Sequence, residues 1–163
     1  MTSLSCDRPG APGRSPYRFS NFATQTMILD AIGTQINSVF PQLRRVTTLD
    51  LQADAGVILF SLSTSLINAQ ALDTVGVFLG LDRGDIVNLN GSFDVFLSHL
   101  TRTNSIPGLP VASSRCNALN FGIDSAYKLA SGAKLALYAC SANLADNEMS
   151  AVASVYWTPA SGL

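Results

Sequence analysis

Residues 55–72 read AGVILFSLSTSLINAQAL and contain no charged side chain. The stretch approaches the ~20 apolar residues that a membrane-spanning helix needs. Within it, however, Ser61, Ser63 and Ser65 alternate with apolar residues. Such alternation is typical of a half-buried strand, because successive side chains point to opposite faces of a sheet. We therefore expect a strand here and no membrane span. Its buried face would be formed by Ile58, Phe60, Leu62 and Leu66.

The same alternation continues on both sides of this stretch. Residues 74–81, TVGVFLGL, place four apolar side chains on one face and Phe78, between two glycines, on the other. Those four are Val75, Val77, Leu79 and Leu81. Upstream, RRVTTLDLQ (44–52) also alternates, and downstream CNALNFGI (116–123) forms a shorter candidate strand. Each pattern favours a sheet with one face against a core.

Two hairpins are predicted in the second half of the chain. In IVNLNGSFDVFL (86–97), Asn90-Gly91 lies between two alternating runs and supplies the positive φ angles that a two-residue hairpin needs. AKLALYACSA (133–142) and MSAVASVYWTP (149–159) are predicted to pair with each other, with the turn at Asp146-Asn147. Between the two predicted hairpins, residues 101–115 lack periodicity and contain two prolines, which predicts a long loop.

The N-terminal 41 residues differ in character from the rest. Residues 1–19 hold Pro9, Pro12 and Pro16, which oppose both helix and strand pairing, so we expect an extended arm. Its basic residues are candidate assembly contacts: Arg8, Arg14 and Arg18. Residues 20–41 carry apolar side chains at helical spacing and end at Pro41, which predicts one amphipathic helix packed on the domain. The apolar positions are Ile28, Leu29, Ile32, Ile36, Val39 and Phe40.

Residues 42–163 would then form a single all-β domain of about seven or eight antiparallel strands. Strands at this spacing are typical of a jelly-roll-like β-sandwich or a barrel. The length of 163 residues suits one domain with a substantial core.

The composition indicates that part of the protein's surface is buried against other subunits. Charged residues make up 13% of the chain, against about 25% in ordinary globular domains, and hydrophobic residues make up 47%. A monomer with so little charge would be poorly soluble, so we expect an oligomer. The alternative is a monomer whose surface is rich in Ser, Thr and Asn. The net charge of −1 argues against specific nucleic-acid binding, and the N-terminus lacks the hydrophobic core of a secretion signal.

The residues offer little chemistry, and we predict no catalytic, cofactor or metal site. Cys6, Cys116 and Cys140 have no CxxC spacing, and Cys140 is expected to be buried in its apolar run. The sole histidine, His99, has no nucleophile elbow or other triad signature beside it, so a partly buried structural role is favoured. A small β-barrel enzyme stays as a further alternative, since carboxylate pairs meet only in space.

Arg83-Gly84-Asp85 is a candidate adhesion motif. The same residues are turn formers at a point where the chain must reverse, and the turn alone accounts for them. Asn90-Gly91-Ser92 also matches a glycosylation sequon, which the predicted hairpin explains without a glycan.

The arm, the helix, the β-sandwich pattern and the low charge together resemble jelly-roll structural proteins of virions, including phage capsid, decoration and spike subunits. The resemblance implies a non-enzymatic shell or appendage subunit, located in the virion and assembled in the host-cell cytoplasm. Its partners would be copies of itself, other virion proteins and in some cases a host receptor. Close approach between copies would be helped by small residues on outer strand faces: Ser61, Ser63, Ser65, Ala151 and Ala153. The alternative is an extracellular trimeric binding module resembling the tumour-necrosis-factor and C1q-like group, or a lectin.

Overall fold

A computed structural model of the chain describes residues 25–51, 54–68, 73–91, 93–102, 113–122, 124–142 and 148–159. The described residues form ten strands. These are β1 (Gln25–Gln35), β2 (Gln42–Asp50), β3 (Ala55–Asn68), β4 (Thr74–Leu81), β5 (Ile86–Asn88), β6 (Val95–Arg102), β7 (Ser113–Asn120), β8 (Tyr127–Leu129), β9 (Lys134–Ser141) and β10 (Glu148–Pro159). No helix in these ranges is long and apolar enough to cross a membrane.

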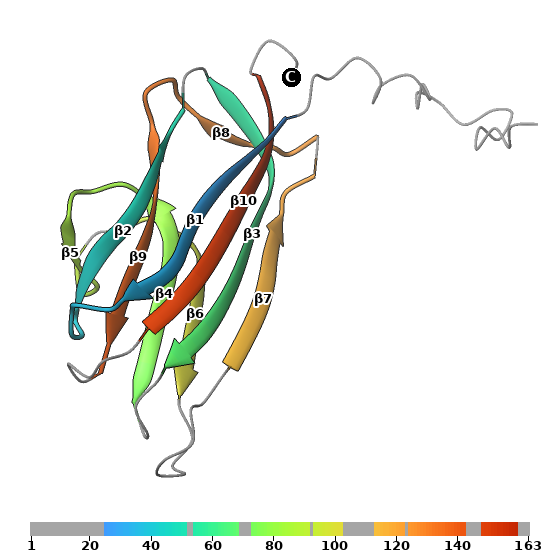
Figure 1. The fold of residues 1–163 in the computed structure, drawn as a ribbon. Helices are drawn as coiled ribbons and strands as arrows, with labels where there is room; N and C mark the ends of the chain where they lie inside the picture. Colours follow the sequence, from blue (N-terminus) through green and yellow to red (C-terminus); the bar gives the residue numbers. More distant parts are fainter. Residues whose placement is uncertain are drawn as a thin grey trace, which may run out of the picture.

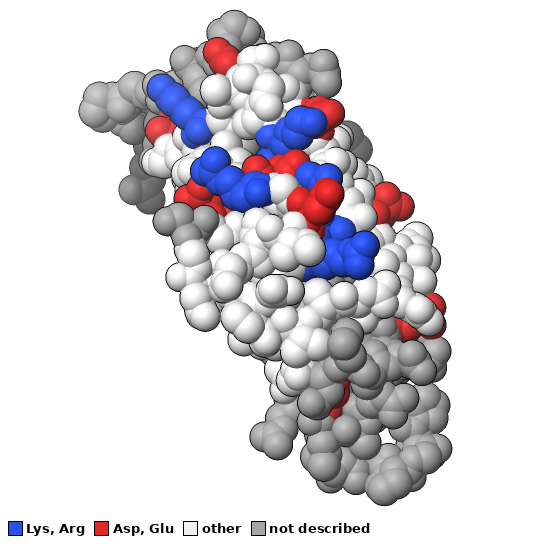
Figure 2. All heavy atoms as spheres, turned by 90° about the vertical axis from the view of Figure 1, so that its left-hand side faces the viewer, with Lys and Arg blue, Asp and Glu red and all other residues white. Residues whose placement is uncertain are grey.

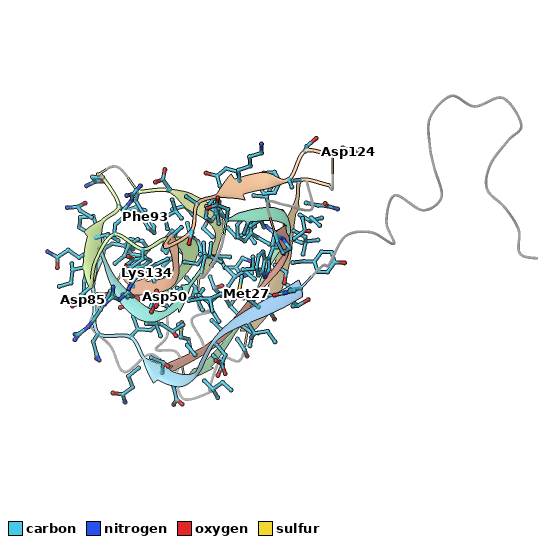
Figure 3. The ribbon with its side chains drawn as sticks, turned by 90° about the horizontal axis from the view of Figure 1, so that it is seen from above. Met27, Asp50, Asp85, Phe93, Asp124 and Lys134 are labelled. Carbon is cyan, nitrogen blue, oxygen red and sulfur yellow. The ribbon has the colours of Figure 1, made fainter. Side chains whose placement is uncertain are left out.

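The strands form two sheets that face each other (Figures 1 and 3). Sheet A has the order β1-β10-β3-β7, with β8 also paired to β3, and sheet B has the order β5-β2-β9-β4-β6. Without the short β5 and β8, each sheet holds four strands that alternate between early and late positions in the chain. This interleaved order is that of a jelly roll, in which two Greek keys wrap into a sandwich. The chain is therefore a jelly-roll β-sandwich, as the strand pattern predicted.

The core lies between the two sheets, and the alternation in the sequence locates most of it. Phe60 and Leu62 of β3 are fully buried on the inner side of sheet A. Val75, Val77 and Leu79 of β4 face them from sheet B. Phe78 points to the other side of β4, as predicted, and belongs to a second apolar cluster on the outer side of sheet B.

The helix predicted over residues 20–41 is wrong for the residues that the structure describes. Residues 25–35 form the edge strand β1, which pairs with β10 from Gln25↔Trp157 to Gln35↔Glu148. The apolar spacing looked helical because apolar side chains lie on both faces of β1: Leu29 is buried, whereas Ile28 and Ile32 are exposed on the outer side. The register also shifts between Ala31 and Thr34, where Gly33 has a φ of +58°, and this bulge ends the period of two. Residues 1–24, which hold the predicted arm and the start of the helix, lie outside the described residues.

Both predicted hairpins are also wrong, although a turn does occur at Asn90-Gly91. The N–H of Gly91 donates to the carbonyl oxygen of Asn88 at 2.9 Å, but Gly91 is not among the glycines with positive φ. The strands on either side separate, because β5 pairs with β2 and β6 pairs with β4 at the opposite edge of sheet B.

The two C-terminal strands likewise belong to different sheets. β9 lies between β2 and β4, whereas β10 lies between β1 and β3. The predicted turn at Asp146-Asn147 falls outside the described residues. The long loop predicted over 101–115 is shorter than expected, because β6 extends to Arg102 and β7 begins at Ser113.

Candidate functional site: a clamped turn and an open sheet face

The Arg83-Gly84-Asp85 tripeptide lies in the connection that leads from the end of β4 at Leu81 to the start of β5 at Ile86. Gly84 has a φ of +112°, and a Cβ built at this position would meet nothing within 4 Å. Its N–H donates to Oδ1 of Asp82 at 3.0 Å, so an aspartate side chain fixes the backbone two residues ahead. The backbone geometry is that of a turn in which glycine is favoured by conformation and not by lack of space.

Ion pairs tie this connection to its surroundings. Nη1 of Arg45, on β2, lies 2.9 and 2.8 Å from the two carboxylate oxygens of Asp82, and Nη2 of Arg45 contacts Asp85. Nη2 of Arg83 lies 2.6 Å from Oδ2 of Asp94. Both charged side chains of the tripeptide are thus paired, yet they remain accessible: Asp85 is 81% and Arg83 54% exposed.

Tyr138 forms hydrogen bonds with the backbone of the same turn. This residue of β9 is fully buried, and its hydroxyl lies 2.9 Å from the carbonyl oxygen of Gly84 and 3.1 Å from Oδ1 of Asp82. The N–H of Arg83 donates to the same hydroxyl at 2.9 Å. Burial raises the pKa of the Tyr138 phenol, so the group stays a neutral donor and acceptor.

Asp82 is the acceptor on which these contacts converge. Burial by itself would raise the pKa of its carboxyl, but hydrogen bonds from the Gly84 N–H, Arg45 and Tyr138 outweigh that effect. The pKa of Asp82 is therefore lower than its ordinary value. We name this set of residues the clamped turn: Arg45, Asp82, Arg83, Gly84, Asp85 and Tyr138.

The clamped turn helps to cover the outer side of sheet B. A second apolar cluster lies there, formed by Leu43, Phe78, Val87, Ala136, Tyr138 and Cys140. Phe40 and Phe93 pack against it, and the ring of Phe93 meets the Tyr138 ring edge-on at 5.0 Å between centroids. Figure 3 labels Phe93 on this side of the sandwich. Cys140 is buried as predicted, and burial raises the pKa of its thiol to about 12, which makes it unreactive.

The outer side of sheet A, in contrast, is uncovered within the described residues. Four large apolar side chains stand exposed on it: Ile28 (60%), Ile32 (75%), Val152 (40%) and Tyr156 (37%). Small residues lie between and beside them in register, since Ile28 pairs with Ser154, Ser154 with Ser61 and Ser61 with Ala118. We call this surface the open face.

One detail of the predicted surface needs correction. Ala151 and Ala153 were expected on an outer strand face, but they are 1% and 0% exposed and belong to the core. Their neighbours Val152 and Ser154 point outward instead, because β10 alternates with the opposite parity. The serines were placed correctly: Ser63 is exposed, and Ser61 and Ser65 are partly exposed. The adjacent Tyr156 and Trp157 divide as predicted, with Tyr156 at the surface and Trp157 buried.

Polar groups on the open face bond to one another. The hydroxyls of Ser61 and Ser154 form a hydrogen bond across β3 and β10, and Ser150 accepts one from the N–H of Gly33 at 3.1 Å. The described charges on this side lie away from its middle: Asp30 on the edge strand β1, Glu148 beside Gly33 at the start of β10, and Lys128 on the short strand β8. The middle of the open face therefore consists of apolar side chains and of polar groups that already have hydrogen-bond partners.

Charged residues gather on a different side of the molecule. Figure 2 shows the side on which β5 and β2 lie in Figure 1, with basic and acidic side chains interleaved in one band. The pairs of the clamped turn contribute to this charge, and Lys134 lies 3.3 Å from Asp50 nearby, as Figure 3 also shows. Because the two signs alternate, the band does not present a field of one sign.

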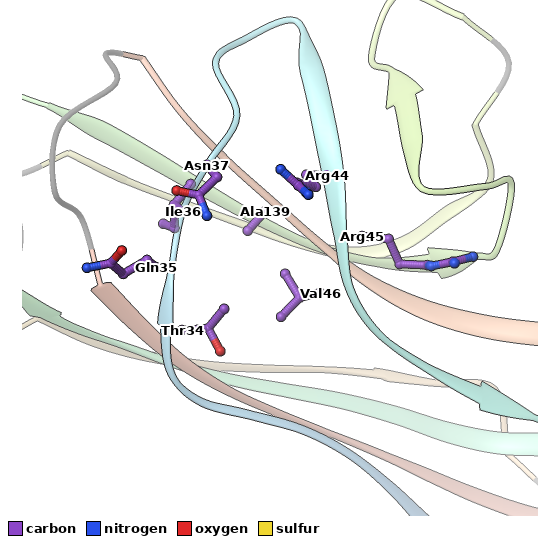
Figure 4. Close-up of a pocket in the computed structure, with 8 residues that line it drawn as sticks. All are labelled: Thr34, Gln35, Ile36, Asn37, Arg44, Arg45, Val46 and Ala139. Atoms are coloured by element: carbon purple, nitrogen blue, oxygen red, sulfur yellow. The ribbon is translucent and has the colours of Figure 1, made fainter.

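Two shallow hollows lie beside Arg44 between the end of β1 and β2. The first, of about 170 Å³, is shown in Figure 4 and the second is about 210 Å³. The first is lined by Thr34, Gln35, Ile36, Asn37, Arg44, Arg45, Val46 and Ala139. The described lining holds the hydroxyl of Thr34 but no histidine, cysteine or carboxylate group that could activate it.

The remaining chemical candidates are structural in their contacts. His99 is 5% exposed, and its Nδ1 lies 2.8 Å from Oγ1 of Thr64 in the sandwich interior. Cys116 is exposed on β7. Across the described ranges, no group of three or more His, Cys, Asp or Glu residues is placed to hold a metal ion.

The fold and these surfaces define a jelly-roll protein with one self-covered and one open sheet. No family model matches the chain, and a search of curated proteins finds no match. Among solved structures it is similar to Eiger TNF from S. frugiperda, with a TM-score of 0.47, 14% identity, and coverage of 80% of this chain and 91% of that one.

It is also similar to structures of particles of infectious bursal disease virus. For the T13 viral particle the TM-score is 0.42 at 8% identity, covering 83% of this chain and 35% of the viral chain. For the VP2 subviral particle the values are 0.39 and 8%, with 84% and 33% covered. The chain thus spans about a third of these viral chains, and the likeness to all of them is one of fold.

Proposed function

We propose that the protein is a non-enzymatic structural subunit of a virion, in the shell or in a decoration or spike, that acts by self-association. The observation that carries the proposal is the difference between the two sheets. The chain covers the outer side of sheet B with its own segments, whereas it leaves Ile28, Ile32 and Val152 exposed on sheet A. An exposed apolar face of this kind is typical of a protein interaction site.

The energetics of the open face favour association. Removing apolar surface from water contributes roughly 25 cal/mol per Å². Burying polar groups opposes this unless they keep hydrogen bonds, and here Ser61 and Ser154 already bond to each other. With 13% charged residues in the whole chain, few charges would have to be desolvated when copies meet.

The proposed setting is a virion assembled in the host-cell cytoplasm, with copies of the chain and other virion proteins as partners. Residues 1–19, with Arg8, Arg14 and Arg18, would act as an assembly arm that reaches a neighbour.

Measurement of native mass tests this function. Sedimentation velocity or native mass spectrometry of the purified chain at micromolar concentration is expected to show a multimer that dissociates on dilution. A chain that stays monomeric up to about 100 μM, well above the micromolar range of a specific contact, would overturn the proposal.

A second candidate function is an extracellular binding module that recognises a receptor through Arg83-Gly84-Asp85. The exposure of the Asp85 carboxylate, 81%, favours it. The ion pairs to Arg45 and Asp94 would not prevent recognition, because exposed ion pairs are worth only about 0–1 kcal/mol and open easily. Attachment to host cells, measured with the variants discussed below, separates this function from a purely structural turn.

A further inference from the structure

We infer that two copies of the chain pack their open faces against each other in a two-fold contact, an inference that rests on the proposed function. An apolar face gains most from an apolar partner. On the described surface, the other large exposed apolar side chains are scattered over three places: Ile86 and Leu89 by β5, Val95 and Leu100 on β6, and Tyr127 on β8. The matching surface for the open face is therefore the open face of a second copy, which makes the contact isologous.

The size of the open face fits such a contact. Four strands spaced by about 4.8 Å, each about ten residues long at about 3.3 Å per residue, give a projected area of roughly 600 Å². The accessible area of a surface with side chains exceeds its projection. A standard specific interface buries about 800 Å² per partner, so one sheet face is of the required order.

The residues at the centre of the face allow close approach. Ser154 and Ser61 pair in register across β10 and β3, as do Val152 and Ser63. These short side chains permit two sheets to pack at about 10 Å, the usual spacing in a sandwich. Asp30 on the edge strand β1 pairs in register with Val152, so the contact also brings this carboxylate close to the partner and makes a further carboxylate beside it costly.

Cys116 provides a natural probe of this contact. It pairs in register with Ser63 on the same side of sheet A and is exposed in the single chain. A second copy on the open face would cover its thiol. The buried Cys140 stays silent, and Cys6 is removed from the measurement by the substitution Cys6→Ser.

The first test compares two glutamate substitutions. Val152→Glu places a carboxylate on the open face beside Asp30, its partner in register, whereas Leu100→Glu places one at a comparably exposed apolar position on sheet B. Because a buried unpaired charge costs several kcal/mol, Val152→Glu is expected to weaken association about a hundredfold or more by sedimentation. Leu100→Glu is expected to leave it within about threefold, since its site stays in water.

The second test measures the reaction of Cys116 with a thiol reagent in the Cys6→Ser chain, which keeps Val152. The rate is expected to fall about twofold at the dissociation constant and more than about tenfold at about a hundred times that concentration, because a covered thiol reacts only from the free chain. If the chain is multimeric but Val152→Glu does not change its mass and Cys116 stays reactive, the two-fold contact is wrong and the proposed function stands. If Cys116 is equally protected in a monomer, the chain covers its own face and the inference fails. A chain that is monomeric throughout overturns both.

Discussion

The hydroxyl of Tyr138 lies 2.9 Å from the carbonyl oxygen of Gly84, although 54 positions separate the two residues in the chain. The bond joins a central strand of sheet B to the exposed turn after β4. Because the N–H of Arg83 donates to the hydroxyl oxygen of Tyr138, one buried side chain fixes two peptide groups of the turn. Tyr138 thereby joins the Arg83-Gly84-Asp85 tripeptide to the apolar cluster on the outer side of sheet B.

Replacing Tyr138 by Phe is expected to destabilise the fold without disturbing its packing. The ring keeps its contact with Phe93, but the Arg83 N–H and the Gly84 carbonyl lose a partner. The free energy of unfolding should fall by about 1–2 kcal/mol, measured by chemical denaturation. Tyr127→Phe is the matched control, since Tyr127 is a partly exposed ring in an aromatic cluster. Equal effects of the two substitutions would show that the Tyr138 hydroxyl contributes nothing specific.

Stability is expected to fall in acid because of Asp82. The pKa of its carboxyl is lower in the folded chain than the ordinary value of 3.8, so the unfolded chain binds the proton more tightly. The contribution of this group is complete above pH 3.8 and is lost as the pH falls through the folded-state pKa. Urea denaturation between pH 2 and 6 measures this loss. Asp82→Asn should be less stable at pH 6 and should show a shallower acid dependence; an unchanged slope would assign the acid sensitivity to other groups.

Deleting residues 1–16 is expected to affect assembly more than folding. Three prolines and the lack of apolar periodicity set this segment apart in the sequence, and the first strand that the structure describes begins at Gln25. The thermal transition of the isolated subunit should stay nearly unchanged, whereas multimers should become fewer or weaker by sedimentation. If the truncated chain does not fold, the segment belongs to the core and the prediction is wrong.

Alternation alone predicted the strands that carry the core. In β4 every second residue from Val75 to Leu79 faces the main core, and Phe78 faces the second cluster, as the sequence indicated. The pairing of the strands was harder to predict from the sequence, because a jelly roll pairs strands that are distant in the chain. β9 and β10 are neighbours in sequence and lie in opposite sheets, and no local pattern in either strand reports this.

The errors at the N-terminus and on the surface have local causes. Apolar residues on both faces of β1, together with the bulge after Ala31, mimic the spacing of a helix. The clamped turn could not be predicted, since Arg45 and Tyr138 come from β2 and β9, distant in sequence from Asp82. The presence of a turn at Gly84 was predictable from residue types; the partners that hold it depend on the sheet order.

Substitutions in Arg83-Gly84-Asp85 separate a structural turn from a receptor ligand. Gly84→Ala is expected to cost about 1 kcal/mol or more, because its φ of +112° strains any residue with a Cβ even though the space beside it is open. Asp85→Glu is expected to cost little, because the carboxylate is 81% exposed and its ion pair with Arg45 is worth about 0–1 kcal/mol. Receptor recognition would show the reverse ranking in attachment to host cells, since lengthening the carboxylate moves the charge that a receptor reads. The measurements are thermal stability and cell attachment for both variants beside the unsubstituted chain. If attachment is lost in Asp85→Glu at unchanged stability, the tripeptide functions in adhesion. If attachment is equal for all three chains, the tripeptide is a structural turn that helps to cover the outer side of sheet B.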